Sequence, residues 1–227
     1  MPGLKLQHEM RHFAAFFAHL KSLGFAPGTV IDVGVASHTK DLYEAYPSAY
    51  FILVEPLVEF EPKMKQTLAR YRGEYHLCAL SDSDRTERFF VNNKQLEGST
   101  LCYDGIPASD PRLRDVPVRT LDSLLEGRTL QGPLLIKTDV QGQDLNVVRG
   151  ATRTLQDTEV VILEIPMFGP WGGGDEFTDY VKVMEGLGFV AYDVIGYLTR
   201  PYDAALSHLD VVFVKRAGKF RAHKRFN

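Results

Sequence analysis

Asp32, Gly34 and Glu55 have the types and spacing of a nucleotide-type binding pocket. Asp32 and Gly34 lie in the run T-V-I-D-V-G-V-A-S over residues 29–37, where a β-branched strand ends in a turn of small residues. Glu55 follows 23 residues after Asp32, at the end of the apolar run Y-F-I-L-V. Small turn residues let a ligand approach the backbone, and a carboxylate ending the next strand can accept hydrogen bonds from ribose hydroxyls. We therefore expect a ligand that contains adenosine.

The turn after this strand disfavours a dinucleotide. A pyrophosphate is bound by G-x-G-x-x-G at a helix N-terminus, whereas Gly34 is followed by V-A-S-H up to His38. An adenosine ligand without a pyrophosphate needs only the tight turn and the ribose acid, so S-adenosylmethionine is the expected cofactor. Alone, the motif is also compatible with any strand-turn-helix unit, because glycine is common in such turns.

Hydrophobic periodicity predicts alternating helices and strands. Apolar residues at helical spacing, ended by Gly24, predict a leading amphipathic helix over 7–23 within a leading segment 1–27. A core over 28–216 and a basic tail over 217–227 complete one predicted domain over 1–227. Strands separated by helices imply a Rossmann-like α/β sheet, mostly parallel, with helices on both faces. The seven expected strands begin at Gly28 and then lie at 50–54, 75–80, 134–140, 160–165, 189–195 and 209–214.

Composition restricts the class of protein. The chain has 227 residues, 44% of them hydrophobic, which is enough for a packed core. A net charge of -3 argues against a nucleic-acid partner. Cys78 and Cys102 form neither a C-x-x-C pair nor a disulfide framework, so we expect a reduced, cytoplasmic protein. No apolar run is long enough to span a bilayer.

Ligands of parallel sheets bind at the carboxyl ends of the strands. The stretch 91–117, rich in Asn, Gly, Asp and Pro, is expected to be an irregular excursion beside this rim. The polar residues predicted at the rim are Asp32, Glu55, Ser81, Asp82, Asp139 and Glu164.

An ordered series of short motifs resembles the FkbM family of S-adenosylmethionine-dependent methyltransferases over about residues 29–216. The motifs are T-V-I-D-V-G (29–34), L-V-E-P (53–56), A-L-S-D (79–82), G-S-T-L (98–101), T-L-D (120–122), I-K-T-D-V-Q-G (136–142) and V-I-L-E (161–164). The resemblance implies a seven-stranded methyltransferase sheet whose last strand is antiparallel. It also implies O-methylation of a small hydroxylated acceptor, such as a saccharide or a polyketide-type metabolite. Whether the protein forms a homo-oligomer stays open.

The resemblance also implies roles for individual residues. Asp32 and Gly34 would line the methionine and ribose side of the cofactor, and Glu55 would hold the ribose hydroxyls. Ser81 and Asp82 would border the adenine, and Asp139 would lie nearest the sulfonium. The chain departs from the family where V-A-S-H lacks a second loop glycine and where Gln141 replaces a carboxylate. These departures leave open an inactive protein that binds an adenosyl ligand or serves as a scaffold.

Methylation of an alcohol requires a base or a metal ion beside the hydroxyl, because the cofactor supplies only the electrophile. Asp139 is the first candidate for that base, or for a ligand of a divalent metal such as magnesium. His38 and His208 are the histidines best placed for proton transfer, and Glu164 could orient the substrate. Strand-end carboxylates also commonly cap helices or bind loop amides, so a structural role for each stays open.

Three other segments carry patterns with more than one interpretation. H-E-x-x-H at His8–His12 matches a zinc-protease motif, but the short preceding segment favours a solvated helix face. The stretch 166–175 combines Trp171 with three glycines and could be a substrate lid, or a loop whose tryptophan closes the core edge. The basic run 216–225 is either solvated or a weak contact for an anionic partner.

Overall fold

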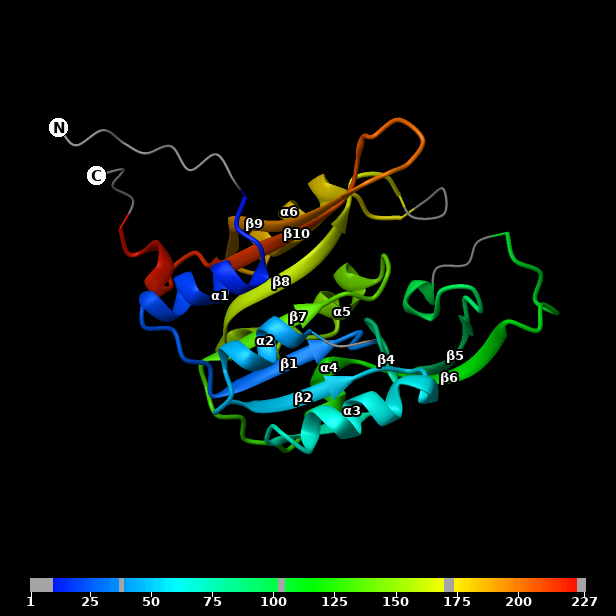
Figure 1. The fold of residues 1–227 in the computed structure, drawn as a ribbon, viewed down its shortest axis with the longest axis horizontal. Coiled ribbons are helices and arrows are strands. Elements are labelled where there is room, and N and C mark those ends of the chain that lie inside the picture. Colours follow the sequence, from blue (N-terminus) through cyan, green and yellow to red (C-terminus); the bar gives the residue numbers. More distant parts are fainter. Residues whose placement is uncertain (1–9, 37–38, 102–104, 170–173, 224–227) are drawn as a thin grey trace.

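A computed structural model describes residues 10–36, 39–101, 105–169 and 174–223. Its centre is a seven-stranded sheet between two layers of helices (Figure 1). In spatial order its strands are β3 (Gly73–His76), β2 (Tyr50–Val54), β1 (Thr29–Val33), β7 (Leu134–Thr138), β8 (Thr158–Pro166), β10 (Leu206–Lys215) and β9 (Phe189–Thr199).

The strand directions confirm the predicted arrangement. β1 runs parallel to β2 and β7, and β7 runs parallel to β8. β10 is antiparallel to both of its neighbours, β8 and β9, so the last strand alone is reversed. Every residue of β1 is buried, because helices cover both faces of the sheet at its centre. This double burial explains why the central strands have continuous apolar runs in the sequence.

Successive residues of β1 point to opposite faces of the sheet, and this alternation places the polar residues. Val30 packs with α1, α2 and α3, whereas Ile31 packs with α4, α5 and α6. Asp32 therefore faces the layer of α2, where the Tyr43 hydroxyl donates a hydrogen bond to its carboxylate. The helices are α1 (Phe13–Ser22), α2 (Lys40–Ala45), α3 (Glu61–Leu68), α4 (Leu121–Leu124), α5 (Asp144–Arg149) and α6 (Phe177–Gly186).

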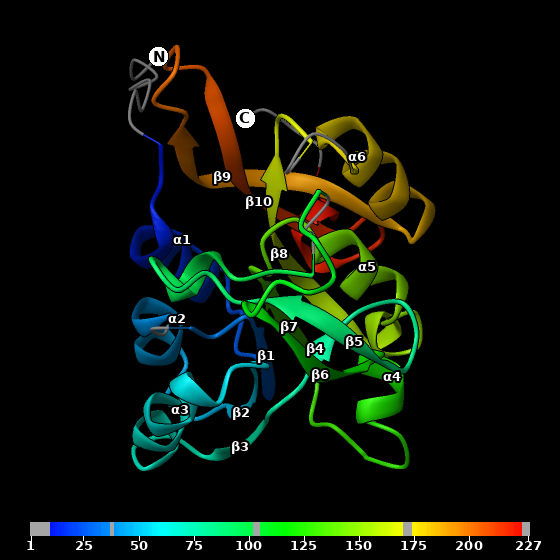
Figure 2. The same cartoon turned by 90° about the vertical axis from the view of Figure 1, so that its right-hand side faces the viewer.

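A smaller, three-stranded sheet stands beside the main one, and the sequence did not predict it (Figure 2). Its order is β4 (Ala79–Leu80), β6 (Leu113–Arg119) and β5 (Arg85–Phe90). The prediction of a single strand over 75–80 is wrong. The first half of this segment pairs with β2 and the second half pairs with β6. The predicted irregular stretch 91–117 likewise ends in a regular strand from Leu113.

The two ends of the chain also differ from the prediction. The leading helix begins at Phe13, not at residue 7, and the described residues before it are not helical. Arg11 is instead held by an ion pair with Asp193 on β9, at 2.9 Å. In the basic tail, the Phe220 ring packs edge-on against Phe25, with centroids 5.6 Å apart. Within the described ranges, no helix is long and apolar enough to cross a membrane.

Candidate active site

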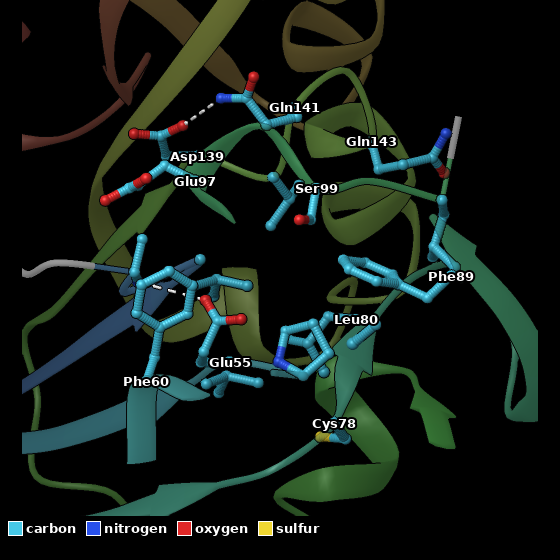
Figure 3. A pocket seen from close by; sticks show the side chains of 18 of the residues that line it. Glu55, Phe60, Cys78, Leu80, Phe89, Glu97, Ser99, Asp139, Gln141 and Gln143 are labelled. Atoms are coloured by element: carbon cyan, nitrogen blue, oxygen red, sulfur yellow. Dashed lines mark hydrogen bonds between the residues drawn. The ribbon is translucent and has the colours of Figure 1, made fainter. Parts of the chain in front are cut away.

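A cavity opens at the carboxyl ends of β1, β2, β4 and β7, and the loop after β5 forms its outer wall (Figure 3). It encloses about 510 Å³ of space not filled by atoms, its open mouth included. The cavity therefore lies at the end of the sheet where parallel sheets usually bind their ligands.

Gly34 allows two strand ends to meet at the floor of this cavity. Its φ is +75°, and a Cβ built there would lie 2.0 Å from the backbone oxygen of Asp139. The approach is held by main-chain hydrogen bonds, from Gly34 to Val54 at 2.9 Å and from Asp139 to Val33 at 3.0 Å. A side chain at position 34 would separate the two turns, so the glycine is required by contact as well as by conformation.

Glu55 ends β2 with its carboxylate inside the cavity. One oxygen accepts a hydrogen bond from the Leu57 backbone N–H at 2.9 Å, and the other accepts from the Ala36 backbone N–H at 3.2 Å. Burial raises the pKa of Glu55 to about 7, against the lowering effect of these two bonds. Each oxygen keeps a further acceptor position, which suits a pair of neighbouring hydroxyl groups.

The side of the cavity next to Glu55 is apolar. Phe60 and Phe89 face it from opposite sides, and Leu80 and Cys78 lie between them (Figure 3). Burial raises the pKa of the Cys78 thiol to about 11, so this sulfur is a neutral, apolar contact at pH 7. Two aromatic rings around a narrow apolar space are suited to a flat heteroaromatic ring.

The opposite side carries ionised groups, beginning with Lys137 on β7. Its side chain is only 6% exposed, and its ammonium lies 3.3 Å from Asp139 and 3.9 Å from Asp32. Burial lowers the pKa of Lys137, but the carboxylates of Asp139, Asp32 and Asp210 outweigh it and raise that pKa above its ordinary value. Asp139 lines the cavity with 37% of its side chain exposed, so one carboxylate of this group reaches the ligand space.

Gln141 extends the polar group from Asp139 to β8. Its side-chain amide donates to Asp139 at 3.1 Å and to Glu164 at 3.2 Å. Burial, followed by the carboxylates of Asp139, Asp144 and Asp210, raises the pKa of Glu164 to about 9. Burial also raises the pKa of Asp144 to about 7 and that of Asp210 to about 6. Glu164 is therefore protonated at neutral pH.

The chain matches a model of the methyltransferase FkbM domain over residues 32–191, more than half of its length. It belongs to the FkbM methyltransferase family. The match confirms the family that the motifs predicted.

Solved structures confirm the fold. The crystal structure of methyltransferase FkbM from Methylobacillus flagellatus KT superposes with a TM-score of 0.53 at 15% identity, over 90% of this chain and 48% of that one. The present chain thus spans about half the length of that relative. Magnesium protoporphyrin IX methyltransferase from Synechocystis PCC 6803, solved with bound S-adenosylmethionine, gives a TM-score of 0.49 at 14% identity, over 89% and 77% of the two chains. A comparison with curated proteins gives no match.

In this FkbM-family chain, the structure brings three of the predicted residues together at the cavity: Gly34, Glu55 and Asp139. Glu164 is joined to them through Gln141. Asp32 is fully buried behind the floor, between Tyr43 and Lys137. Asp32 therefore does not line the cavity.

The remaining predicted residues either lie away from the cavity or fall outside the described residues. At β4 the cavity wall is formed by Cys78, Ala79 and Leu80, whereas Ser81 is fully buried and Asp82 pairs with Arg85 at 3.3 Å. His38 and Trp171 fall outside the described residues.

His208, on β10, lies within electrostatic reach of Asp139, and burial lowers its pKa. A neutral imidazole at pH 7 can accept a proton, so its predicted role in proton transfer stays a prediction. Among the residues described, no group of three or more His, Cys, Asp or Glu side chains is arranged to hold a metal ion.

Sequence reasoning missed Lys137, Asp210 and the two phenylalanines of the apolar wall. Lys137 and Asp210 each interrupt an apolar strand, which is itself a signal, because a buried charge requires a partner. Phe60 and Phe89 gave no comparable signal, since nothing local distinguishes them from core residues.

Proposed function

We propose that this chain is an S-adenosylmethionine-dependent methyltransferase that methylates a hydroxyl group of a small acceptor. The observation that carries the proposal is Glu55, a buried carboxylate whose two oxygens are oriented by backbone N–H groups at one side of the cavity. Membership of the FkbM family supports the same reaction.

The cavity residues fit the two ends of this cofactor. The apolar space between Phe60 and Phe89 suits the adenine ring, and Glu55 suits the ribose hydroxyls. The turn at Gly34 and the carboxylate of Asp139 then remain for the methionine end. The negative charge of Asp139 is appropriate there, because a sulfonium is a cation.

When bound, S-adenosylmethionine supplies an electrophilic methyl group, so the protein must orient the acceptor and remove its proton. Asp139 is the proposed proton acceptor, because it is the partly exposed carboxylate of the polar group. Glu164, protonated at neutral pH, is a proposed hydrogen-bond donor to the acceptor. A pair of neighbouring carboxyl groups in different environments is typical of acid–base sites.

The proposed acceptor is a saccharide, a polyketide-type ring or a related metabolite with several hydroxyl groups. Glu164 and Asp210 lie opposite each other on β8 and β10, beside Asp139, and carboxyl groups readily bind hydroxyls. The net charge of -3 disfavours a polyanionic acceptor such as nucleic acid.

Calorimetric titration with S-adenosylmethionine and S-adenosylhomocysteine tests the proposal. We expect micromolar binding that Glu55→Ala weakens about 30- to 150-fold, because two oriented hydrogen bonds of roughly 1–1.5 kcal/mol each are lost. The matched control is Glu59→Ala, four residues on, where the carboxylate pairs with Arg114. NAD should give no heat. Absence of binding by either adenosyl ligand would contradict the proposal and favour a scaffolding role.

A further inference from the structure

Gln141 is the only residue seen to bridge the two carboxyl groups that the proposed reaction uses, among the interactions of the described residues. One amide nitrogen donates to Asp139 Oδ1 at 3.1 Å and to Glu164 Oε2 at 3.2 Å. Asp139 and Gln141 lie side by side at the rim of the cavity, joined by the first of these bonds (Figure 3). The bridge therefore connects the turn after β7 to β8.

The backbone of Gln141 is held in a conformation that a non-glycine residue rarely adopts. Its φ is +53°, in the left-handed region, which is unfavourable for a residue with a Cβ. Its carbonyl oxygen accepts a hydrogen bond from the hydroxyl of Thr100 at 2.9 Å, and Thr100 is fully buried. Strain of this kind persists where surrounding contacts maintain it, and it is common at functional sites.

The amide also provides the second hydrogen bond to the carboxylate of Asp139. Oδ2 of Asp139 accepts from the Lys137 ammonium at 3.3 Å, and Oδ1 accepts from Gln141. The carboxylate is thus held from two sides. An amide donates to two carboxyl groups without adding charge, whereas a carboxylate at position 141 could donate only if protonated and would otherwise repel both.

We propose that Gln141 is a positioning residue that fixes the Asp139 carboxylate at the methionine end of the cavity by tying it to Glu164 on β8. The inference rests on the proposed function. It predicts that the site distinguishes the cationic sulfonium of S-adenosylmethionine from the neutral thioether of S-adenosylhomocysteine. A fixed negative charge favours the cation, which would assist release of the product.

Several other groups act electrostatically on Asp139, and each enters the pH dependence. They come from six elements packed around it. They are Asp32 on β1, Glu55 after β2, Lys137 on β7, Asp144 on α5, Glu164 on β8, and His208 and Asp210 on β10. A variant at position 141 leaves all of them in place, so a change in pH dependence can be assigned to the bridge.

The test is the ratio of the dissociation constants of S-adenosylhomocysteine and S-adenosylmethionine, measured by calorimetry between pH 6 and 8.5. For the wild type we expect a ratio of about 10 at pH 7.5, as one carboxylate near a sulfonium contributes on the order of 1–2 kcal/mol after screening. Gln141→Gly removes the side-chain amide. Glycine readily adopts the positive φ of this position, so the variant should fold. It should lower the ratio to about 2–3.

Gln141→Glu keeps the size of the side chain and replaces the donor by a third carboxyl group. We expect its ratio to rise with pH over this range, because the added proton is lost as the group ionises. The matched control is Gln143→Ala, a second cavity-lining glutamine, whose side-chain oxygen accepts from Asn146 at 2.8 Å. This control should change both affinities by the same factor.

A purely structural role for Gln141 would weaken both ligands equally and leave the ratio at its wild-type value. That result, in Gln141→Gly and Gln141→Glu alike, would overturn the inference while leaving the proposed function standing. Failure of the wild type to bind either ligand would instead overturn the proposed function and the inference that rests on it.

Discussion

The two sides of the cavity differ in the kind of interaction that their side chains make. The side formed by β2, β4, β5 and the loop after β5 is mainly apolar, with the rings of Phe60 and Phe89 around Leu80, and its polar residues are Glu55, Glu97 and Ser99. On the other side, the turn after β7 lines the cavity with Asp139 and Gln141, and Asp139 belongs to a cluster in which the buried Lys137 ammonium lies among carboxyl groups. Both sides lie at the carboxyl end of the sheet, so the difference comes from side chains and not from the position in the fold.

This difference teaches how the site would respond to change. An apolar wall binds through contact area, and the loss of one ring removes a modest and local contribution. In a cluster of buried charges, each side chain is stabilised by the others. Removal of one member therefore leaves the remaining charges without a partner in a medium of low dielectric. Substitutions on the polar side should therefore affect folding, whereas those on the apolar side should mainly affect affinity.

The largest effect is expected for Lys137→Met, which removes the cation from the polar side. The carboxylates of Asp32 and Asp139 would lose their buried partner, so we expect a loss of about 3 kcal/mol in the free energy of unfolding at pH 7.5. Denaturation in urea measures it. The loss should become smaller at pH 5.5, as the carboxyl groups bind protons.

Lys65→Met is the control for this variant. Lys65 pairs with Glu61 at 2.9 Å on α3, but its side chain is 60% exposed, so we expect little or no loss in the free energy of unfolding. Equal losses in the two lysine variants would show that the polar side is not balanced as a unit.

An intermediate effect is expected from Glu164→Gln, measured as stability against pH. The pKa of Glu164 is raised to about 9 in the folded protein, so its contribution is complete below pH 4.5 and is lost as the pH rises toward 9. Between pH 6 and 8 the wild type should lose about 2–3 kcal/mol through this group, and the variant should not.

The wild type should therefore be less stable relative to Glu164→Gln at pH 8 than at pH 6. Glu185→Gln, which removes an exposed ion pair with Arg216, should keep the wild-type pH profile. A stability difference between Glu164→Gln and the wild type that does not vary with pH would show that Glu164 is ionised throughout.

The smallest effect is expected on the apolar side. Phe60→Leu keeps an apolar side chain but removes the ring, so we expect S-adenosylmethionine and S-adenosylhomocysteine to bind about threefold more weakly, by the same factor for each. Val58→Ala, at a 57% exposed residue on the same short 3-10 helix (Val58–Phe60), should leave both affinities unchanged. If Phe60→Leu changed the ratio of the two dissociation constants, the proposed difference between the two sides of the cavity would be contradicted.

Much of the fold could be predicted from local patterns. The central strands are buried on both faces, so their sequences are nearly continuous apolar runs and their positions were found. The strand predicted over 75–80 failed because its two halves pair in different sheets, and no local pattern records which neighbour a strand takes. The start of α1 was missed because Arg11 pairs with Asp193, far away in the sequence.

The sequence by itself determined the family, the parallel sheet, and Gly34, Glu55 and Asp139 at one rim, because side-chain alternation and strand-end chemistry are local properties. Only the tertiary structure decided that Asp32 lies behind the cavity floor, that Lys137 balances it, and that Gln141 joins Asp139 to Glu164. These depend on distances between strands far apart in the chain. The energy of a buried charge is set by such distances, and therefore by packing.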